Sequence, residues 1–185
     1  MVTIFKNIFA KEPYYTTVDK AIARIQEGAS KTPIEEIRTQ ISKDRADKLK
    51  ANLPSVCFSG KFSERHDNKL IEHSGFIVLD FDDVQDLRNT QAEIISNDFV
   101  YACWISPRGN GLKVLVRIAD GKKHREHFAS LQEYFTGIDK SGVNESRVCY
   151  ESYDPEIYIN KAAKPYKKFK TVERVEVKEH KTGSD

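Results

Sequence analysis

The pattern of apolar and polar residues is clearest from residue 75 to residue 160, where it predicts six secondary-structure elements. Short apolar or alternating runs are typical of strands, and apolar residues spaced three or four apart are typical of helices. The expected strands are 75–82, 100–105, 112–118 and 147–153, and the expected helices are 84–96 and 123–135. This order is β-α-β-β-α-β, the ferredoxin-like or RRM-like unit. We therefore predict an α+β fold in which the first and third of these strands are neighbours.

The first 74 residues have a mainly helical pattern. Thr17 is placed to cap a helix that ends before Gly28. Residues 32–35, Thr-Pro-Ile-Glu, have the form of a capping box with proline at the first helical position. A further helix is expected over 44–51 and a strand over 55–59. We therefore expect an N-terminal helical and strand module over residues 1–74, before an RRM-like module over 75–160.

The length of 185 residues and the hydrophobic content of 39% are enough for a compact domain with a real core. No apolar run approaches the roughly 20 residues of a membrane helix, and the N-terminus lacks a signal-peptide pattern. We therefore expect a cytoplasmic protein without a membrane partner. The three cysteines form no Cys-x-x-Cys pair, which argues against a disulfide framework or a zinc site.

The formal charge of +2 is unevenly distributed. Residues 160–185 carry eight Lys or Arg side chains against four Asp or Glu side chains. A basic end of this kind can bind nucleic acid, or it can simply be a solvated tail. Because residues 161–185 have little apolar periodicity, we predict a basic and flexible tail there.

Two carboxylates end the first strand of the RRM-like module. In the run Leu79-Asp80-Phe81-Asp82, side-chain alternation places Asp80 and Asp82 on the same face of the strand. Carboxylates this close repel each other unless a divalent cation or a shared proton relieves the repulsion. The alternative is structural, with Asp80 ending the strand and Asp82 or Asp83 capping the next helix.

A lysine on the third strand is expected to face these carboxylates. Lys113 follows the turn Ser106-Pro107-Arg108-Gly109-Asn110-Gly111, which connects two strands. A lysine opposite two aspartates can bind a phosphate together with a metal ion, or it can form a plain salt bridge. Gly109 and Gly111 would let the backbone of the turn approach a phosphate closely.

A third acid lies shortly before the last predicted strand. Asp139 stands in the run Gly137-Ile138-Asp139-Lys140-Ser141-Gly142, and Arg147 follows eight residues later. The pair suits a further metal ligand and a phosphate contact. The alternative is that Asp139 only forms a turn.

These three segments resemble the motifs of archaeo-eukaryotic primases and primase-polymerases. The resemblance is carried by residues 79–82, by residues 106–114 and by the run Ser146-Arg147-Val148-Cys149-Tyr150-Glu151-Ser152-Tyr153-Asp154-Pro155. It covers about residues 55–160. The chain looks most like the small branch known as the VirE N-terminal domain or primase-polymerase, found in mobile elements, phages and some CRISPR-linked proteins.

The resemblance implies the primase fold and a polymerase that uses two magnesium or manganese ions. Asp80, Asp82 and Asp139 would be the catalytic metal ligands. The nucleotide-binding residues would be Ser106, Arg108, Gly109, Gly111, Lys113 and Arg147. Lys61 and Arg65 would contact the template. The partners would be single-stranded DNA, a ribo- or deoxyribonucleoside triphosphate and a helicase or other domain outside this chain.

The sequence also departs from that pattern. Lys113 stands where many relatives carry histidine, and it cannot act as a neutral acceptor near pH 7. Asp154 competes with Asp139 as the third acid. A non-catalytic nucleic-acid or nucleotide-binding module with the same RRM-like fold is therefore the alternative function. His124 and His127, three apart on a predicted helix, are expected on an exposed face rather than at a metal.

Overall fold

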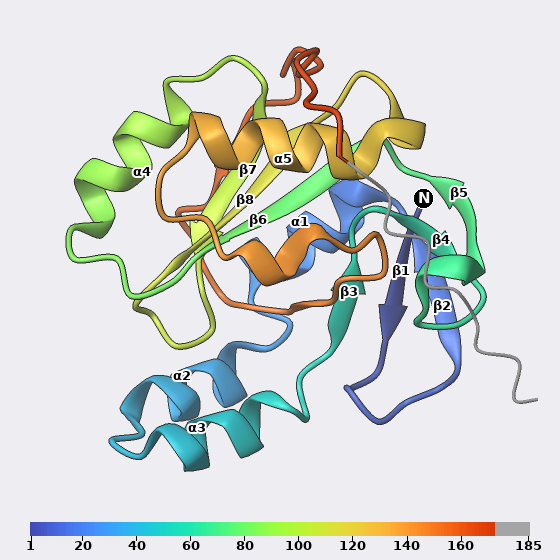
Figure 1. Ribbon diagram of the computed structural model, residues 1–185. Helices are drawn as coiled ribbons and strands as arrows, with labels where there is room; N and C mark the ends of the chain where they lie inside the picture. The colour runs from blue at the N-terminus through green and yellow to red at the C-terminus, as the bar shows by residue number, and fades with distance from the viewer. Residues whose placement is uncertain (173–185) are drawn as a thin grey trace, which may run out of the picture.

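A computed structural model describes residues 1–172 of the chain (Figure 1). Over these residues the protein is a mixed α+β structure with antiparallel sheets and five α-helices. The helices are α1 (Val18–Glu27), α2 (Lys31–Thr39), α3 (Lys43–Lys50), α4 (Leu87–Ile95) and α5 (His124–Tyr134). The strands are β1 (Val2–Phe5), β2 (Pro13–Thr16), β3 (Ser55–Cys57), β4 (Gly60–Phe62), β5 (Leu70–His73), β6 (Phe76–Phe81), β7 (Val100–Ile105), β8 (Leu112–Arg117), β9 (Cys149–Tyr150) and β10 (Tyr158–Ile159).

The central sheet has the strand order β10-β7-β8-β6. Strands β6 and β8 are therefore neighbours, as the sequence predicts for the first and third strands of an RRM-like unit. Their register places Asp80 directly opposite Lys113, and Trp104 of β7 lies on the other side of Lys113. The prediction that Lys113 faces the carboxylates at the end of this strand is thus confirmed for Asp80.

The last predicted strand differs from the expectation. Only Cys149 and Tyr150 form a strand, β9, and it pairs with β3 in a second sheet of order β2-β1-β3-β9. The free edge of β6 instead meets Ile138, which forms a single antiparallel bridge with Phe81. The buried Glu151, which follows β9, explains why this segment pairs with β3. Its carboxylate forms an ion pair with Arg24 of α1 at 2.6 Å, which stabilises the segment beside the N-terminal elements.

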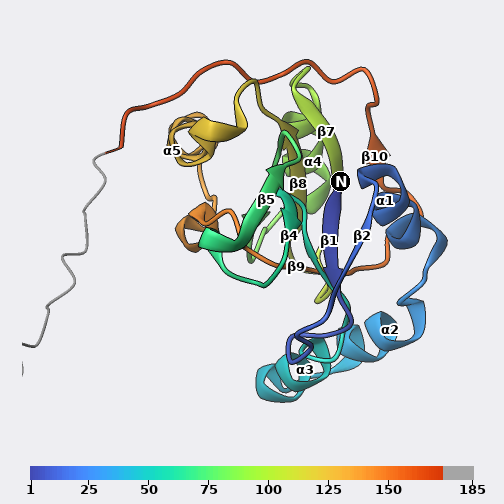
Figure 2. The same ribbon diagram turned by 90° about the vertical axis from the view of Figure 1, so that its right-hand side faces the viewer.

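The two faces of the central sheet pack into different cores. The odd-numbered residues Ile77, Leu79 and Phe81 of β6 pack in a cluster with α4 and α5. Phe76 and Val78 face the opposite way, toward β1, β3 and α1. Figure 2 shows α1 and α5 on opposite sides of the strands, and both Figures 1 and 2 show α2 and α3 together at one end of the molecule. The predicted modules 1–74 and 75–160 therefore share one of the two main cores.

The N-terminal helices follow the sequence only in part. Thr17 caps α1 by accepting a hydrogen bond from the backbone N–H of Lys20 at 3.2 Å, and Gly28 ends the helix with a φ of 82°. The predicted capping box at residues 32–35 is wrong, because α2 already begins at Lys31. Pro33 is tolerated there because it lies in the first turn, where a backbone N–H has no partner within the helix.

Four strands in the first 74 residues were not predicted. Strands β1 and β2 lie in a region whose pattern indicates helices, and β4 and β5 lie after the expected strand 55–59, where no further strand was expected before residue 75. Strand β1 is central in its sheet, with all four residues buried. Pairing with β2 and β3, which tertiary structure brings together, stabilises it as a strand.

Residues 161–172 are attached to the body of the protein rather than forming a free tail. Ala163 and Tyr166 are buried, and the backbone N–H of Tyr166 donates to the carbonyl oxygen of Arg117 at 2.7 Å. The remainder of the expected tail, residues 173–185, lies outside the described residues. None of the helices in residues 1–172 is long and apolar enough to cross a membrane.

Candidate functional site

The site begins where an apolar sheet face becomes charged. Phe76 and Val78 of β6 belong to the core, and Asp80 follows them on the same face. The Nζ atom of Lys113 lies 2.5 Å from Oδ1 of Asp80, and the two side chains are only 13% and 10% exposed. Burial is the largest single effect and lowers the pKa of Lys113, but the nearby negative charges, that of Asp80 first, and the hydrogen bond to Asp80 together outweigh it, so the pKa is raised. Lys113 is therefore a charged ammonium group at neutral pH.

Arg147 joins Asp80 to Asp139. Its Nη2 atom lies 3.6 Å from Oδ2 of Asp80 and 3.2 Å from Oδ2 of Asp139. The backbone N–H of Asp139 also donates to the carbonyl oxygen of Asp80 at 2.9 Å. Two acids that are far apart in the sequence thus converge on one guanidinium nitrogen.

Asp139 combines the two roles that the sequence left open. Its Oδ1 and Oδ2 atoms accept hydrogen bonds from the backbone N–H and the hydroxyl of Ser141, at 3.0 and 2.6 Å. These hydrogen bonds, and then the charges of Arg147 and Lys113, lower the pKa of Asp139 below its usual value. The carboxylate is therefore ionised, and it both forms a turn and faces Asp80 through Arg147.

Asp82 lies just beyond the end of β6 and is exposed. It borders a cavity of about 230 Å³, here called the polar cavity, together with Lys113. The polar cavity is lined by Lys43, Asp47, Lys50, Asp82, Asp83, Ser106, Pro107, Arg108, Asn110, Lys113 and Tyr150. Within residues 1–172, no three His, Cys, Asp or Glu side chains are grouped closely enough to hold a metal ion.

The wall of the polar cavity formed by α3 was not predicted. Ser106, Arg108 and Lys113 were predicted site residues and do line the cavity, whereas Lys43, Asp47 and Lys50 come from α3. Their spacing of four and three residues places them on one helix face, which the sequence could have revealed. That this face meets the turn after β7 depends on the tertiary structure.

The glycines of this turn have structural roles. Gly109 has a φ of 81°, and its position packs against the side chain of Arg38. A Cβ atom on Gly111 would lie 2.4 Å from the carbonyl oxygen of Phe81. The guanidinium group of Arg38 anchors the turn, because it donates hydrogen bonds to the carbonyl oxygens of Ser106 and Tyr153, at 3.2 and 2.9 Å. The turn is thus fixed against the end of β6, close to Asp82.

Asp154, the alternative third acid, has a different environment. It is 5% exposed and accepts hydrogen bonds from the backbone N–H groups of Ile105 and Glu156, at 2.9 and 3.0 Å. Its carboxylate satisfies backbone groups inside the fold. Of the two candidates, Asp139 is the one that the structure joins to Asp80.

The two candidate template residues lie elsewhere. The Nζ atom of Lys61 sits 4.7 Å from the ring centre of Tyr15. Arg65 donates to the carbonyl oxygen of Ile8 and lies 5.4 Å from the ring centre of Phe5. Both residues are therefore engaged with the segments around β1 and β2, and neither lines the polar cavity.

The prediction that His124 and His127 lie on an exposed face is wrong. They are 2% and 1% exposed. The Nδ1 atom of His124 lies 2.9 Å from Nε2 of His73 on β5, and Nδ1 of His127 lies 2.7 Å from the carbonyl oxygen of Lys168. Strand β5 and residues 161–172 cover α5 on these sides, which the helix pattern could not show.

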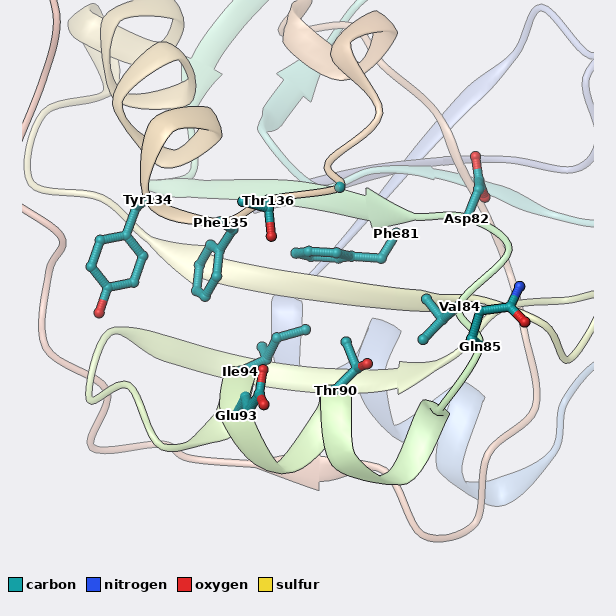
Figure 3. Close-up of a pocket in the computed structure, with 11 residues that line it drawn as sticks. Phe81, Asp82, Val84, Gln85, Thr90, Glu93, Ile94, Tyr134, Phe135 and Thr136 are labelled. Carbon is teal, nitrogen blue, oxygen red and sulfur yellow. The ribbon is translucent and has the colours of Figure 1, made fainter.

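A second cavity, of about 410 Å³, lies between α4, the end of α5 and β6 (Figure 3). Figure 3 shows the rings of Phe81 and Phe135 side by side at its inner end, while Asp82 points away from them. The two rings meet edge to face, with centroids 5.9 Å apart. Asp82 borders both cavities, but neither Lys113 nor Arg108 lines this one.

Comparison with known proteins gives one match. The family model described as BT4734-like, N-terminal domain, matches residues 48–159, which is more than half of the chain. No curated protein and no solved structure matches the chain. The matched residues include β6, the turn after β7, Lys113, Asp139 and Arg147. The protein therefore belongs to the family of BT4734-like N-terminal domains.

Proposed function

We propose that this protein is the catalytic domain of a DNA primase or primer-extending polymerase that transfers nucleotides on a single-stranded DNA template. The observation that carries the proposal is the convergence of Asp80 and Asp139 on Arg147, next to a cavity lined by Lys113 and Arg108. Acids beside a phosphate-sized, cation-lined cavity suit nucleotidyl transfer. The biological setting we propose is replication of a mobile element or phage, or CRISPR-linked DNA synthesis.

The fold supports the same assignment at a finer level. Strands β6, β7 and β8 with helices α4 and α5 follow the element order and the neighbour relations of an RRM-like unit. In this proposal the unit is the core of an archaeo-eukaryotic primase fold. Residues 138–139 then take the position at the free edge of β6 where a fourth strand would otherwise pair.

The acids have the right chemistry for magnesium or manganese. Both metals prefer carboxylate oxygens, and Asp80 and Asp139 each present one oxygen to the same nitrogen of Arg147. Asp80 and Asp139 would hold such a metal ion, which would supply the positive charge that Arg147 supplies here. Arg147 would then be able to contact a phosphate. The exposed Asp82, which lines the polar cavity, would add a third carboxylate by moving closer to the other two when metal binds.

The protein residues mainly position the reactants. Bound metal would activate the attacking 3′-hydroxyl and neutralise the leaving pyrophosphate. Lys113, held by Asp80, keeps a positive charge at the floor of the cavity. Arg108 and Ser106 lie on the turn that forms one wall, where they can bind the phosphates of the incoming nucleotide. In-line displacement requires this positioning above all.

The test is incorporation of labelled nucleotides on a single-stranded template, with and without a primer, in manganese or magnesium. Asp80→Asn and Asp82→Asn should each abolish metal-dependent product, because each removes a carboxylate ligand. Asp44→Asn is the matched control, because Asp44 is 82% exposed on α3 and should leave the activity unchanged. Primer-free product would identify a primase. Absence of product from the wild type with both metals would overturn the catalytic proposal.

A second candidate function is a non-catalytic module that binds nucleic acid or nucleotides. The observation that favours this function is that Asp80 is already paired with Lys113, and Asp139 with Arg147. Both carboxylates therefore have a positively charged partner within the protein. Such a module would bind single-stranded DNA in a salt-sensitive way without any need for metal. Binding that persists in EDTA and in Asp82→Asn, with no polymerisation, would favour this function.

A further inference from the structure

Helix α3 presents a charged face to the polar cavity. Lys43, Asp47 and Lys50 line one wall, while Arg108 lies on the turn after β7. Helix α3 belongs to the N-terminal part of the chain, more than 50 residues before that turn. The cavity is therefore lined by two parts of the chain, one from residues 1–74 and one from residues 75–160.

Two cations of this cavity have no partner within the part of the chain that the structure describes. Among residues 1–172, neither Lys43 nor Arg108 takes part in an ion pair or in a side-chain hydrogen bond. Lys50 is only partly engaged, because its Nζ atom lies 3.6 Å from Oδ1 of Asp47 and 5.2 Å from the ring centre of Tyr150. Lys113, by contrast, is held by Asp80. The cations with free bonding capacity thus stand on both walls of the cavity.

We propose that α3 is a phosphate clamp, in which Lys43 and Lys50 bind the terminal phosphates of a nucleoside triphosphate. This inference rests on the proposed function and adds the role of α3 to it. The cavity of about 230 Å³ is smaller than the roughly 300–1,000 Å³ of sites that enclose a whole small molecule. The polar cavity therefore suits the phosphate chain of a nucleotide, while the base and the sugar remain outside. Lysine ammonium groups bind phosphate oxygens through charge-assisted hydrogen bonds.

The clamp has a built-in opposing charge. Asp47 lies between the two lysines on the same helix face and pairs with Lys50. An anion that enters the cavity must compete with this carboxylate for Lys50. Removing the charge of Asp47 should consequently strengthen phosphate binding, while removing either lysine should weaken it.

The experiment is a titration of the whole protein with fluorescent adenosine tri-, di- and monophosphates, in calcium to prevent turnover. Lys43→Ala and Lys50→Ala should each weaken triphosphate binding by about tenfold, the effect of losing one charge-assisted hydrogen bond in an open site. Monophosphate binding should stay unchanged. Asp47→Asn should tighten triphosphate binding. Lys48→Ala is the matched control, because Lys48 lies on the same helix, is 78% exposed and does not line the cavity.

The outcomes separate this inference from the proposed function. If the wild type binds no triphosphate, both are overturned. If the wild type binds triphosphate and the lysine variants bind it equally well, only the clamp is overturned. The clamp would also be overturned if the lysine variants lost the same affinity for the tri-, di- and monophosphate. It would be overturned likewise if they lost single-stranded DNA binding but bound triphosphate as the wild type does. The side chains of both lysines reach solvent, so circular dichroism should show that the variants keep the wild-type fold.

Discussion

At the scale of single residues, the charges around Asp80 depend on one another. Asp80 is 9% exposed at the end of a buried strand, and its carboxylate is held by Lys113 and, at a greater distance, by Arg147. A carboxylate in such a place needs compensating charge, because its loss of hydration is costly. The close contact with Lys113 supplies most of that compensation.

We therefore predict that Lys113→Met destabilises the protein by about 3 kcal/mol, the lower end for removing one partner of a buried ion pair. Arg147 remains near Asp80 and limits the loss. Urea denaturation measures the free energy of unfolding. The double variant Asp80→Asn/Lys113→Met should recover part of the stability, because the unpaired charge is gone. A double variant less stable than Lys113→Met would contradict this explanation.

At the scale of elements, α5 is held against β5 through the contact of His124 with His73. Burial, followed by the charge of His73, lowers the pKa of His124 from 6.5 to about 3. Burial also lowers the pKa of His73. A histidine with a lowered pKa stabilises the fold above its unfolded pKa and loses that contribution as the pH falls.

We predict that the free energy of unfolding falls as the pH drops from 6.5 toward 3, with a contribution from His124 of at most about 1.4 kcal/mol per pH unit. The unfolded chain binds a proton in this range that the folded His124 does not. His124→Gln should flatten the slope in urea denaturation at a series of pH values. His66→Gln, at an exposed histidine, is the control and should keep the wild-type slope. Equal slopes for both variants would contradict the prediction.

At the scale of the whole molecule, residues 1–74 and residues 75–160 form one structure. Trp104, the only tryptophan of the chain, is fully buried in the core that both parts share. Six large apolar residues of this core lie before residue 75, namely Val2, Ile4, Ile22, Ile25, Val56 and Phe58. Each fully buried side chain of this size contributes about 1.5–3 kcal/mol, whereas a whole domain is stable by about 5–15 kcal/mol.

We therefore predict that residues 75–160 expressed alone do not form the native fold. The apolar face of the central sheet would be exposed to water without β1, β3 and α1. Trp104 fluorescence should be red-shifted, and near-ultraviolet circular dichroism should be lost, in comparison with residues 1–172. A fragment with native tryptophan emission and cooperative unfolding would show instead that residues 75–160 fold independently.

The sequence anticipated much of the central sheet and of its charged end. Alternation and the order of elements can be read along the sequence, and the RRM-like order that they predict makes the first and third strands neighbours. This was enough to expect Lys113 to face the carboxylates, and the register places it opposite Asp80. The site was anticipated less completely. Lys43 and Lys50 were missed, since a charged helix face is typical of solvent exposure unless its neighbours are known. The buried His124 was missed for the corresponding reason, because its helix pattern does not reveal β5.

The sequence by itself determined the strands and helices from β6 to α5, since local periodicity and turn residues specify them. Only the tertiary structure decided that β9 joins β3 and that Asp139 takes the edge of β6. It also decided that α3 closes the polar cavity. These contacts join residues far apart in the chain. Many alternative pairings of such distant segments would bury similar surfaces. The pairing that forms is the one in which buried charges such as Glu151 and Asp80 also find their partners.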